Sequence, residues 1–185
     1  KFNMFGKNEV EESKCEQLLL ETNDLRSVIT SFAYTHYKNK DLENEAAKEV
    51  FNKAFQNNNA GKIQKFENWM KENQDDKNYF LINNETTIPD FNLFDILDFY
   101  VEFLQYYNFA TDKNKKNIFN ELGYPNISKF YNNFIQLPKM QKYLNSIFYT
   151  LPYTNKSARF GSGIKGDTWN HTSQVDETPA ELIIN

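Results

Sequence analysis

The sequence has a single cysteine, two histidines, five prolines and six glycines among 185 residues. One cysteine excludes an intrachain disulfide and is typical of a reducing compartment. The two histidines, His36 and His171, lie far apart and have no acidic or cysteine residues at ligand spacing. We therefore expect a cytoplasmic protein without a metal site.

Neither sign of charge is in large excess. The chain has 21 Lys and Arg against 25 Asp and Glu, a formal net charge of −4, so no broad basic surface for nucleic acid is expected. The most apolar stretch, residues 87–107, carries several acids. Each Asp at the centre of a bilayer costs about 2.5–3.5 kcal/mol. We therefore expect no membrane span.

What the sequence does contain is a helix that is apolar almost all round, at residues 87–107. An amphipathic surface helix would show only an apolar stripe, so this pattern predicts a central helix packed on most of its circumference. Thr87 and Asp90, with Pro89 in the first turn, predict a capping box that starts the helix. The polar positions form one narrow strip, which consists of Asp95, Asp98, Glu102 and Gln105.

Apolar residues at helical spacing predict further helices on both sides of this segment. No internal repeat and no convincing strand is visible. Residues 150–185 are rich in Gly, Ser and Thr and predict an extended tail. We therefore predict an all-α fold, with a helical domain over residues 1–149 around the central buried helix. The further helices cover residues 8–37 with Asn8 as the candidate cap, 41–73 with a break at 57–61, 115–122, a helix capped by Asn126, and a last one ending near Tyr149. A polar loop is expected at residues 73–78.

Residue types alone reveal little catalytic chemistry. Cys15 lies on the apolar face of the first predicted helix, so we interpret it as a buried structural thiol rather than a nucleophile. Both histidines are interpreted as solvated. The glycines at residues 161–166 lack the preceding strand and following helix that a phosphate loop requires. At this level the sequence supports only a soluble all-α domain.

The order of several segments is more specific. They are the opening KFNMFG, the helix end TNDLRSVITSFAY, the segment NYFLINNETTIPDFNLFDILD, and YPNISKFYNNFIQLPKMQKYLNS followed by LPYTNKS. In this order they resemble the C-terminal, all-helical half of a cytosolic glutathione transferase. The K-x-N-x-x-G opening and the L-P tail are most similar to the mu class. The resemblance extends over residues 1–160.

The resemblance implies roles for individual residues. Asp24 matches an aspartate that reaches toward glutathione held by the neighbouring subunit, and Tyr34 matches a tyrosine whose hydroxyl faces the electrophilic substrate and assists addition. Asn23, Thr30 and Ser157 match positions in or near the same substrate pocket. Without the resemblance, Tyr34 would be interpreted as a core aromatic at a helix end and Asp24 as a solvated acid. Glutathione as co-substrate, a small hydrophobic electrophile and a homodimer are also implied.

The sequence also departs from that family. The glycine that precedes the asparagine in the loop YFLINN is absent, and insertions occur near residues 57–61 and 73–78. The thioredoxin-like N-terminal domain, which holds most of the glutathione site, is not in the given sequence. Two hypotheses follow. The chain is the C-terminal half of a glutathione transferase, an enzyme if an N-terminal half exists, or it is a non-catalytic, transferase-like binding or scaffold subunit of a larger assembly. A carrier of apolar ligands is a third, weaker alternative.

Overall fold

The computed structural model describes residues 4–56, 61–73, 80–83, 85–155 and 157–162, and this part of the chain is helical, without strands. The all-α prediction is confirmed. No helix in these ranges is both long and apolar enough to cross a membrane. The elements are α1 (Glu9–Tyr34), α2 (Lys40–Phe51), the π-helical turn η1 (Asn52–Gln56), α3 (Lys62–Asn73), α4 (Ile88–Tyr106), α5 (Ile118–Glu121), α6 (Pro125–Gln136), α7 (Pro138–Leu144) and the 3-10 turn η2 (Ile147–Thr150).

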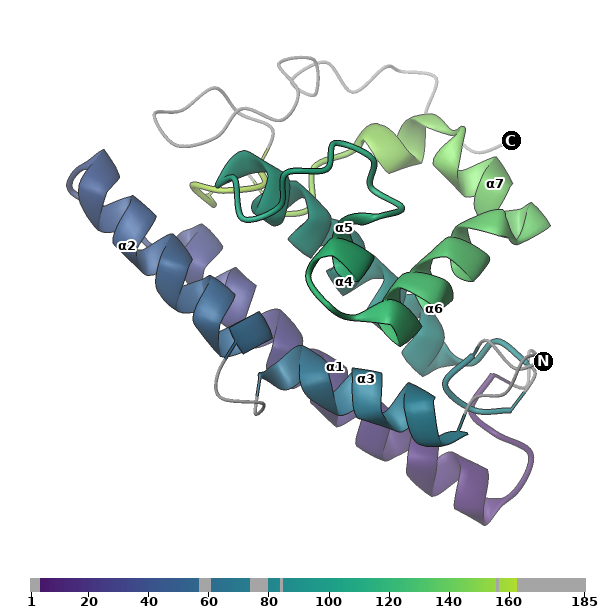
Figure 1. Ribbon diagram of the computed structural model, residues 1–185. Coiled ribbons are helices and arrows are strands. Elements are labelled where there is room, and N and C mark those ends of the chain that lie inside the picture. Colours follow the sequence, from purple (N-terminus) through teal and green to yellow (C-terminus); the bar gives the residue numbers. More distant parts are fainter. Residues whose placement is uncertain (1–3, 57–60, 74–79, 84, 156, 163–185) are drawn as a thin grey trace.

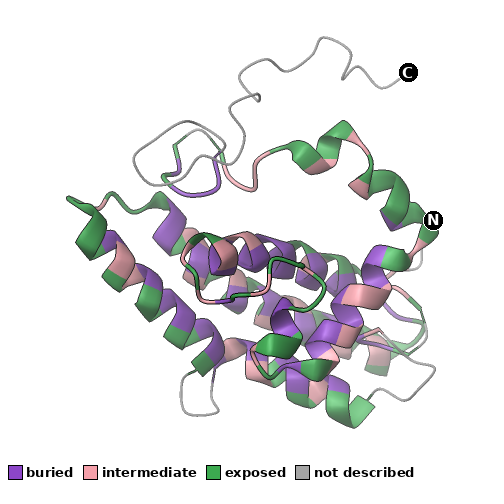
Figure 2. Ribbon diagram, turned by 45° about the horizontal axis from the view of Figure 1, so that its top comes forward, coloured by how far each residue is buried: buried purple, intermediate pink, exposed green. Residues whose placement is uncertain are grey.

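Helix α4 is the central element, as predicted. Helix α4 lies along α1, and α6 packs on both α3 and α4 (Figure 1). Buried residues concentrate where these helices meet, whereas α7 and η2 are mostly exposed or half-buried (Figure 2). The fully buried side chains of α4 include Leu93, Ile96, Leu97, Tyr100, Val101, Phe103 and Leu104. Burial of this many large apolar side chains accounts for most of the force that holds the bundle together.

The start of α4 is fixed by the predicted capping box. Thr87 is the N-cap and Asp90, at the third helical position, is completely buried. The Asp90 carboxylate accepts hydrogen bonds from the Thr87 N–H (2.7 Å), the Thr87 hydroxyl (2.6 Å) and the Leu81 N–H (2.8 Å). Burial nevertheless raises the pKa of Asp90 to about 6. One carboxylate thus ties the chain before α4 to the first turn of the helix.

Helix α1 packs along α4. Asn8 caps it by accepting from the N–H groups of Val10 and Glu11, as predicted. Cys15 is fully buried on its inner face, as predicted, and burial raises the pKa of its thiol. The Tyr100 hydroxyl of α4 donates to the Leu25 carbonyl of α1 at 2.9 Å, so the helix–helix contact also has a buried polar anchor.

The predicted cap of α6 was wrong. Asn126 lies inside the helix, the N-cap is Tyr124, and no side chain at that cap position accepts a hydrogen bond. The acceptor comes from α3 instead, because the buried Glu67 carboxylate accepts from the N–H groups of Asn126 (3.0 Å) and Ile127 (2.9 Å). An acid at a helix N-terminus is favoured by the free N–H groups and by the helix dipole. Helix α3 therefore caps α6 across the fold.

The predicted break in the second helical segment is consistent with the described residues, because α2 continues as η1 to Gln56 and α3 begins at Lys62. Residues 57–60 and most of the predicted loop at 73–78 lie outside the described part. The same holds for the predicted tail beyond residue 162 and for His171.

Candidate functional site

Three of the residues that the resemblance assigns to a substrate pocket lie on one face of α1. Asn23, Thr30 and Tyr34 are seven and four residues apart, which places them on the same side of a helix. Asn23 is exposed, Thr30 is half-buried, and Tyr34, the last residue of α1, is 38% exposed. We call these three residues the α1 face. It is a polar surface that a small molecule or another domain can reach.

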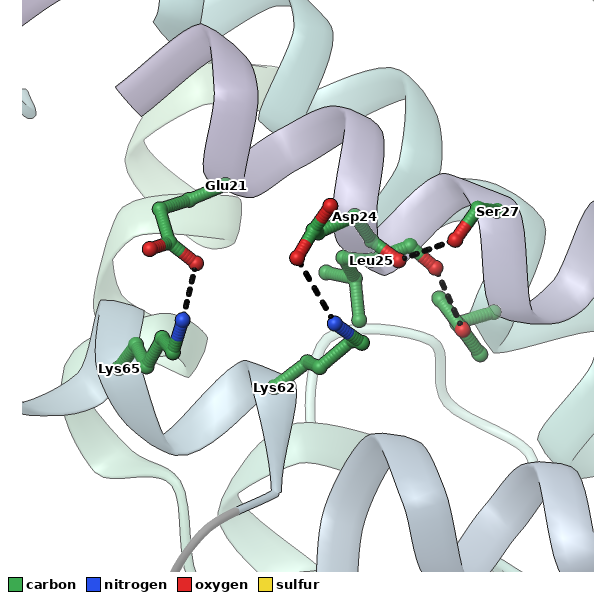
Figure 3. Close-up of polar contacts among 7 residues, drawn as sticks. Glu21, Asp24, Leu25, Ser27, Lys62 and Lys65 are labelled. Atoms are coloured by element: carbon green, nitrogen blue, oxygen red, sulfur yellow. Dashed lines mark hydrogen bonds and ion pairs between the residues drawn. The ribbon is translucent and has the colours of Figure 1, made fainter. Parts of the chain in front are cut away.

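Asp24 lies on the neighbouring flank of α1, toward α3. Its carboxylate forms an ion pair with Lys62 at 2.9 Å, beside a second pair between Glu21 and Lys65 at 2.6 Å (Figure 3). The hydrogen bond from Lys62 lowers the pKa of Asp24. The Asp24 side chain is 61% exposed, and exposed pairs contribute only about 0–1 kcal/mol. Asp24 is therefore an ionised, accessible acid whose partner is easily exchanged.

Ser157 is itself exposed, but the residues after it dock on the end of α1. The N–H groups of Arg159 and Phe160 donate to the Ala33 carbonyl at 2.7 and 3.2 Å. The Arg159 side chain also donates to His36 Nδ1 at 2.8 Å, so this exposed histidine is not simply solvated. The structure thus brings the segment after Ser157 to the same end of α1 as Tyr34.

The α1 face is too long to surround one small ligand by itself. Asn23 lies 11 residues before Tyr34, roughly 16 Å away at the rise of an α-helix. The described residues bring Tyr34 and residues 158–160 to one end of α1, with Asn23 and Asp24 nearer its middle. A pocket that includes all five predicted site residues therefore needs additional residues to complete its wall.

A second candidate site was missed by sequence reasoning. It is a pocket of about 570 Å³ between α4, α7 and residues 148–153, and we call it the α4–α7 pocket. Asp98, a member of the polar strip of α4, lines it and is only 2% exposed. Asp95 of the same strip is exposed and pairs with Arg26 at 2.7 Å, as a surface acid does.

Three tyrosine hydroxyls converge on Asp98. Tyr131 (2.6 Å) and Tyr149 (3.2 Å) donate to Oδ1, and Tyr153 (2.6 Å) donates to Oδ2. Burial and the nearby Asp98 charge raise the pKa of all three phenols well above the usual range, so they remain protonated donors. The only available signal in the sequence was an acid within an apolar helix together with several tyrosines in the last third of the chain.

The described residues form neither a metal site nor a phosphate loop. Within the described ranges no three His, Cys, Asp or Glu side chains lie close enough to hold a metal ion. Gly161 has a positive φ of 80°, and a Cβ there would lie 2.9 Å from the Phe99 ring, so this glycine has a packing role. Gly163 and Gly166 lie outside the described residues.

Comparison with known proteins identifies the domain. The family described as "Glutathione S-transferase, C-terminal domain" matches residues 23–147, more than half of the chain. No curated protein matches the chain at significant similarity. The matched range includes α2 to α7, the capping box of α4 and the C-terminal part of α1. The chain therefore belongs to the glutathione S-transferase C-terminal domain family.

Proposed function

We propose that the chain is the C-terminal half of a glutathione transferase, closest to the mu class, which adds glutathione to small hydrophobic electrophiles. The observation that carries the proposal is the α1 face in a member of this family. Tyr34 lies there at the end of α1, on which residues 158–160 dock. A substrate wall needs such an accessible surface with a hydroxyl donor.

In the proposed reaction the glutathione thiolate attacks an electrophilic carbon, and negative charge develops on the electrophile or its leaving group. Tyr34 donates a hydrogen bond to that charge, a role that pre-organised donors fill well. The nucleophile is the thiolate rather than the thiol. A thioredoxin-like N-terminal half would bind glutathione and lower the pKa of its thiol, and residues 1–149 of this chain would form the helical domain beside it.

Asp24 would contact glutathione across a homodimer. Its exposed ion pair with Lys62 supports this role, because the ammonium group of glutathione can replace the lysine at little cost. Asn23, Thr30 and Ser157 would complete the substrate pocket. A lone buried cysteine also fits the proposed cytoplasmic location.

Two measurements test the proposal: the intact mass of the native protein and the kcat of a Tyr34 variant. The intact mass shows whether about 80 residues precede the 21.9 kDa of this chain. Tyr34→Phe should then lower kcat for glutathione conjugation by roughly 10-fold or more, since a hydrogen bond to a charged group contributes about 1.5–3 kcal/mol. Tyr143→Phe is the matched control, because it also removes an exposed hydroxyl but from α7.

An unchanged kcat in Tyr34→Phe with every electrophile tried would remove Tyr34 from the mechanism. A native mass near 21.9 kDa without conjugating activity would favour the binding or scaffold subunit instead.

A further inference from the structure

The α4–α7 pocket is independent of the α1 face. Its walls come from α4, α7 and residues 148–153, and none of the predicted glutathione or substrate residues lines it. Its volume of about 570 Å³ lies within the range of about 300–1,000 Å³ that is typical of small-molecule sites.

The charge inside the pocket is unbalanced. Asp98 is buried and receives three hydroxyl hydrogen bonds, but among the described residues no lysine or arginine forms an ion pair with it. A carboxylate has about four acceptor positions. Two donors reach Oδ1 and one reaches Oδ2, so Oδ2 can accept one more hydrogen bond. A buried carboxylate without a cation is costly, and a cationic ligand would offset that cost.

The wall around Asp98 is also suited to a cation. Aromatic rings attract cations through the negative potential of their faces, by about 0.5–2 kcal/mol for each good contact. The rings also accept an apolar ligand body by burying its surface. Six aromatic side chains line the pocket: Phe91, Phe94, Tyr143, Phe148, Tyr149 and Tyr153.

We propose that the α4–α7 pocket binds an amphipathic organic cation, with the apolar body against the aromatic wall and the ammonium group directed to Oδ2 of Asp98. A neutral apolar molecule would leave the Asp98 charge unbalanced. An organic anion would meet Lys139 at the pocket but would be repelled by Asp98 deeper inside. Asp95, the other acid of the lining, is already paired with Arg26.

Three probes with the same apolar body and different charge test the proposal. Calorimetric titration of the full chain, without glutathione, would use 4-phenylbutylamine, 4-phenylbutan-1-ol and 4-phenylbutanoate. We expect the amine to bind about 10-fold more tightly than the alcohol, a difference of about 1.4 kcal/mol, and the carboxylate to bind most weakly. Equal affinity for the three probes would overturn the proposal.

Three variants locate the binding. Asp98→Asn should abolish the preference of the protein for the amine over the alcohol. Phe148→Ala removes an exposed ring of the wall and should weaken amine binding roughly 3- to 10-fold. Lys139→Glu reverses an exposed charge at the pocket and should tighten amine binding several-fold. Phe148 and Lys139 are exposed, so their variants should fold. They therefore test the proposal even if Asp98→Asn fails to fold.

Matched controls exist for both surface variants. Ile147→Ala and Lys142→Glu change neighbouring exposed residues that do not line the pocket, and neither should alter amine affinity. Amine binding that is unaffected by Phe148→Ala and Lys139→Glu, or affected equally by their controls, would place the amine elsewhere and overturn the proposal. Since the titration contains no glutathione, its result is independent of the proposed conjugation.

Discussion

Helix α1 keeps its acidic side chains at the surface, whereas α4 keeps two of its acids in the core. Asp24 of α1 is well exposed and pairs with Lys62. Asp90 and Asp98 of α4 are buried and each accepts three hydrogen bonds from neutral donors. Exposed pairs contribute about 0–1 kcal/mol, whereas breaking a buried polar network costs several. The acids of α1 are thus available for a ligand, while the two buried acids of α4 hold the fold or line a pocket.

The largest expected effect is at Asp90. Asp90→Ala should lower the free energy of unfolding by about 3–4 kcal/mol, because two buried N–H groups and one hydroxyl lose their acceptor. Asp95→Ala, on the exposed side of the same helix, should cost less than about 1 kcal/mol. Urea unfolding of both variants makes the comparison. Equal losses in the free energy of unfolding would show that burial does not determine how much each acid contributes to stability.

The same carboxyl predicts a pH dependence. Its pKa is about 6 in the folded protein and 3.8 in the unfolded reference. Between these values the folded protein binds more protons, so the contribution of Asp90 to stability is greatest below pH 3.8 and falls as the pH rises to about 6. The fall amounts to roughly 3 kcal/mol at most. NMR titration of the Asp90 carboxyl measures this pKa, and a value at or below 3.8 would show that its three hydrogen bonds outweigh burial.

A smaller effect is expected where α3 caps α6. Glu67→Ala removes the acceptor of the Asn126 and Ile127 N–H groups and should cost about 2–3 kcal/mol. Glu72→Ala, at an exposed position of α3, is the matched control and should be nearly neutral. Thermal unfolding of the two variants is sufficient to compare them. A Glu67 variant as stable as the control would mean that water caps α6 equally well.

The smallest effect is expected at the surface pair of α1 and α3. Lys62→Met should change stability by less than about 1 kcal/mol and should raise the pKa of Asp24 toward its ordinary value. Added salt should reduce the difference from the wild type, since exposed charges are screened. Loss of several kcal/mol in this variant would show that the pair is structural, and Asp24 would then be less available to glutathione.

The features predicted correctly from sequence depend on neighbouring residues. The apolar pattern of α4 and the spacing of Thr87 and Asp90 identified a buried helix and its first residue, because helix periodicity and capping act within a few positions. The N-cap Asn8 and the buried Cys15 were predicted in the same way.

The features predicted wrongly depend on contacts between distant segments. Asn126 has the right chemistry for a cap, but Glu67 of α3 occupies the place of the acceptor from 59 residues away. The burial of Asp98 was not predicted at all, because the tyrosines that donate to it lie 33 to 55 residues later in the chain. Helical spacing contains no information on such partners. The roles of Asp24 and Tyr34 come from family resemblance and remain predictions.

The buried Cys15 has a consequence for the proposed reaction with electrophiles. It is the sole thiol of this sequence, and it is completely buried on the inner face of α1. Alkylation of cysteine requires an exposed thiolate, so an electrophile can reach this thiol only during transient opening of the bundle. An opening free energy of about 5 kcal/mol would slow this alkylation by more than a thousandfold. Under the proposed function, the packing of α1 against α4 would therefore also protect this thiol from electrophilic substrates.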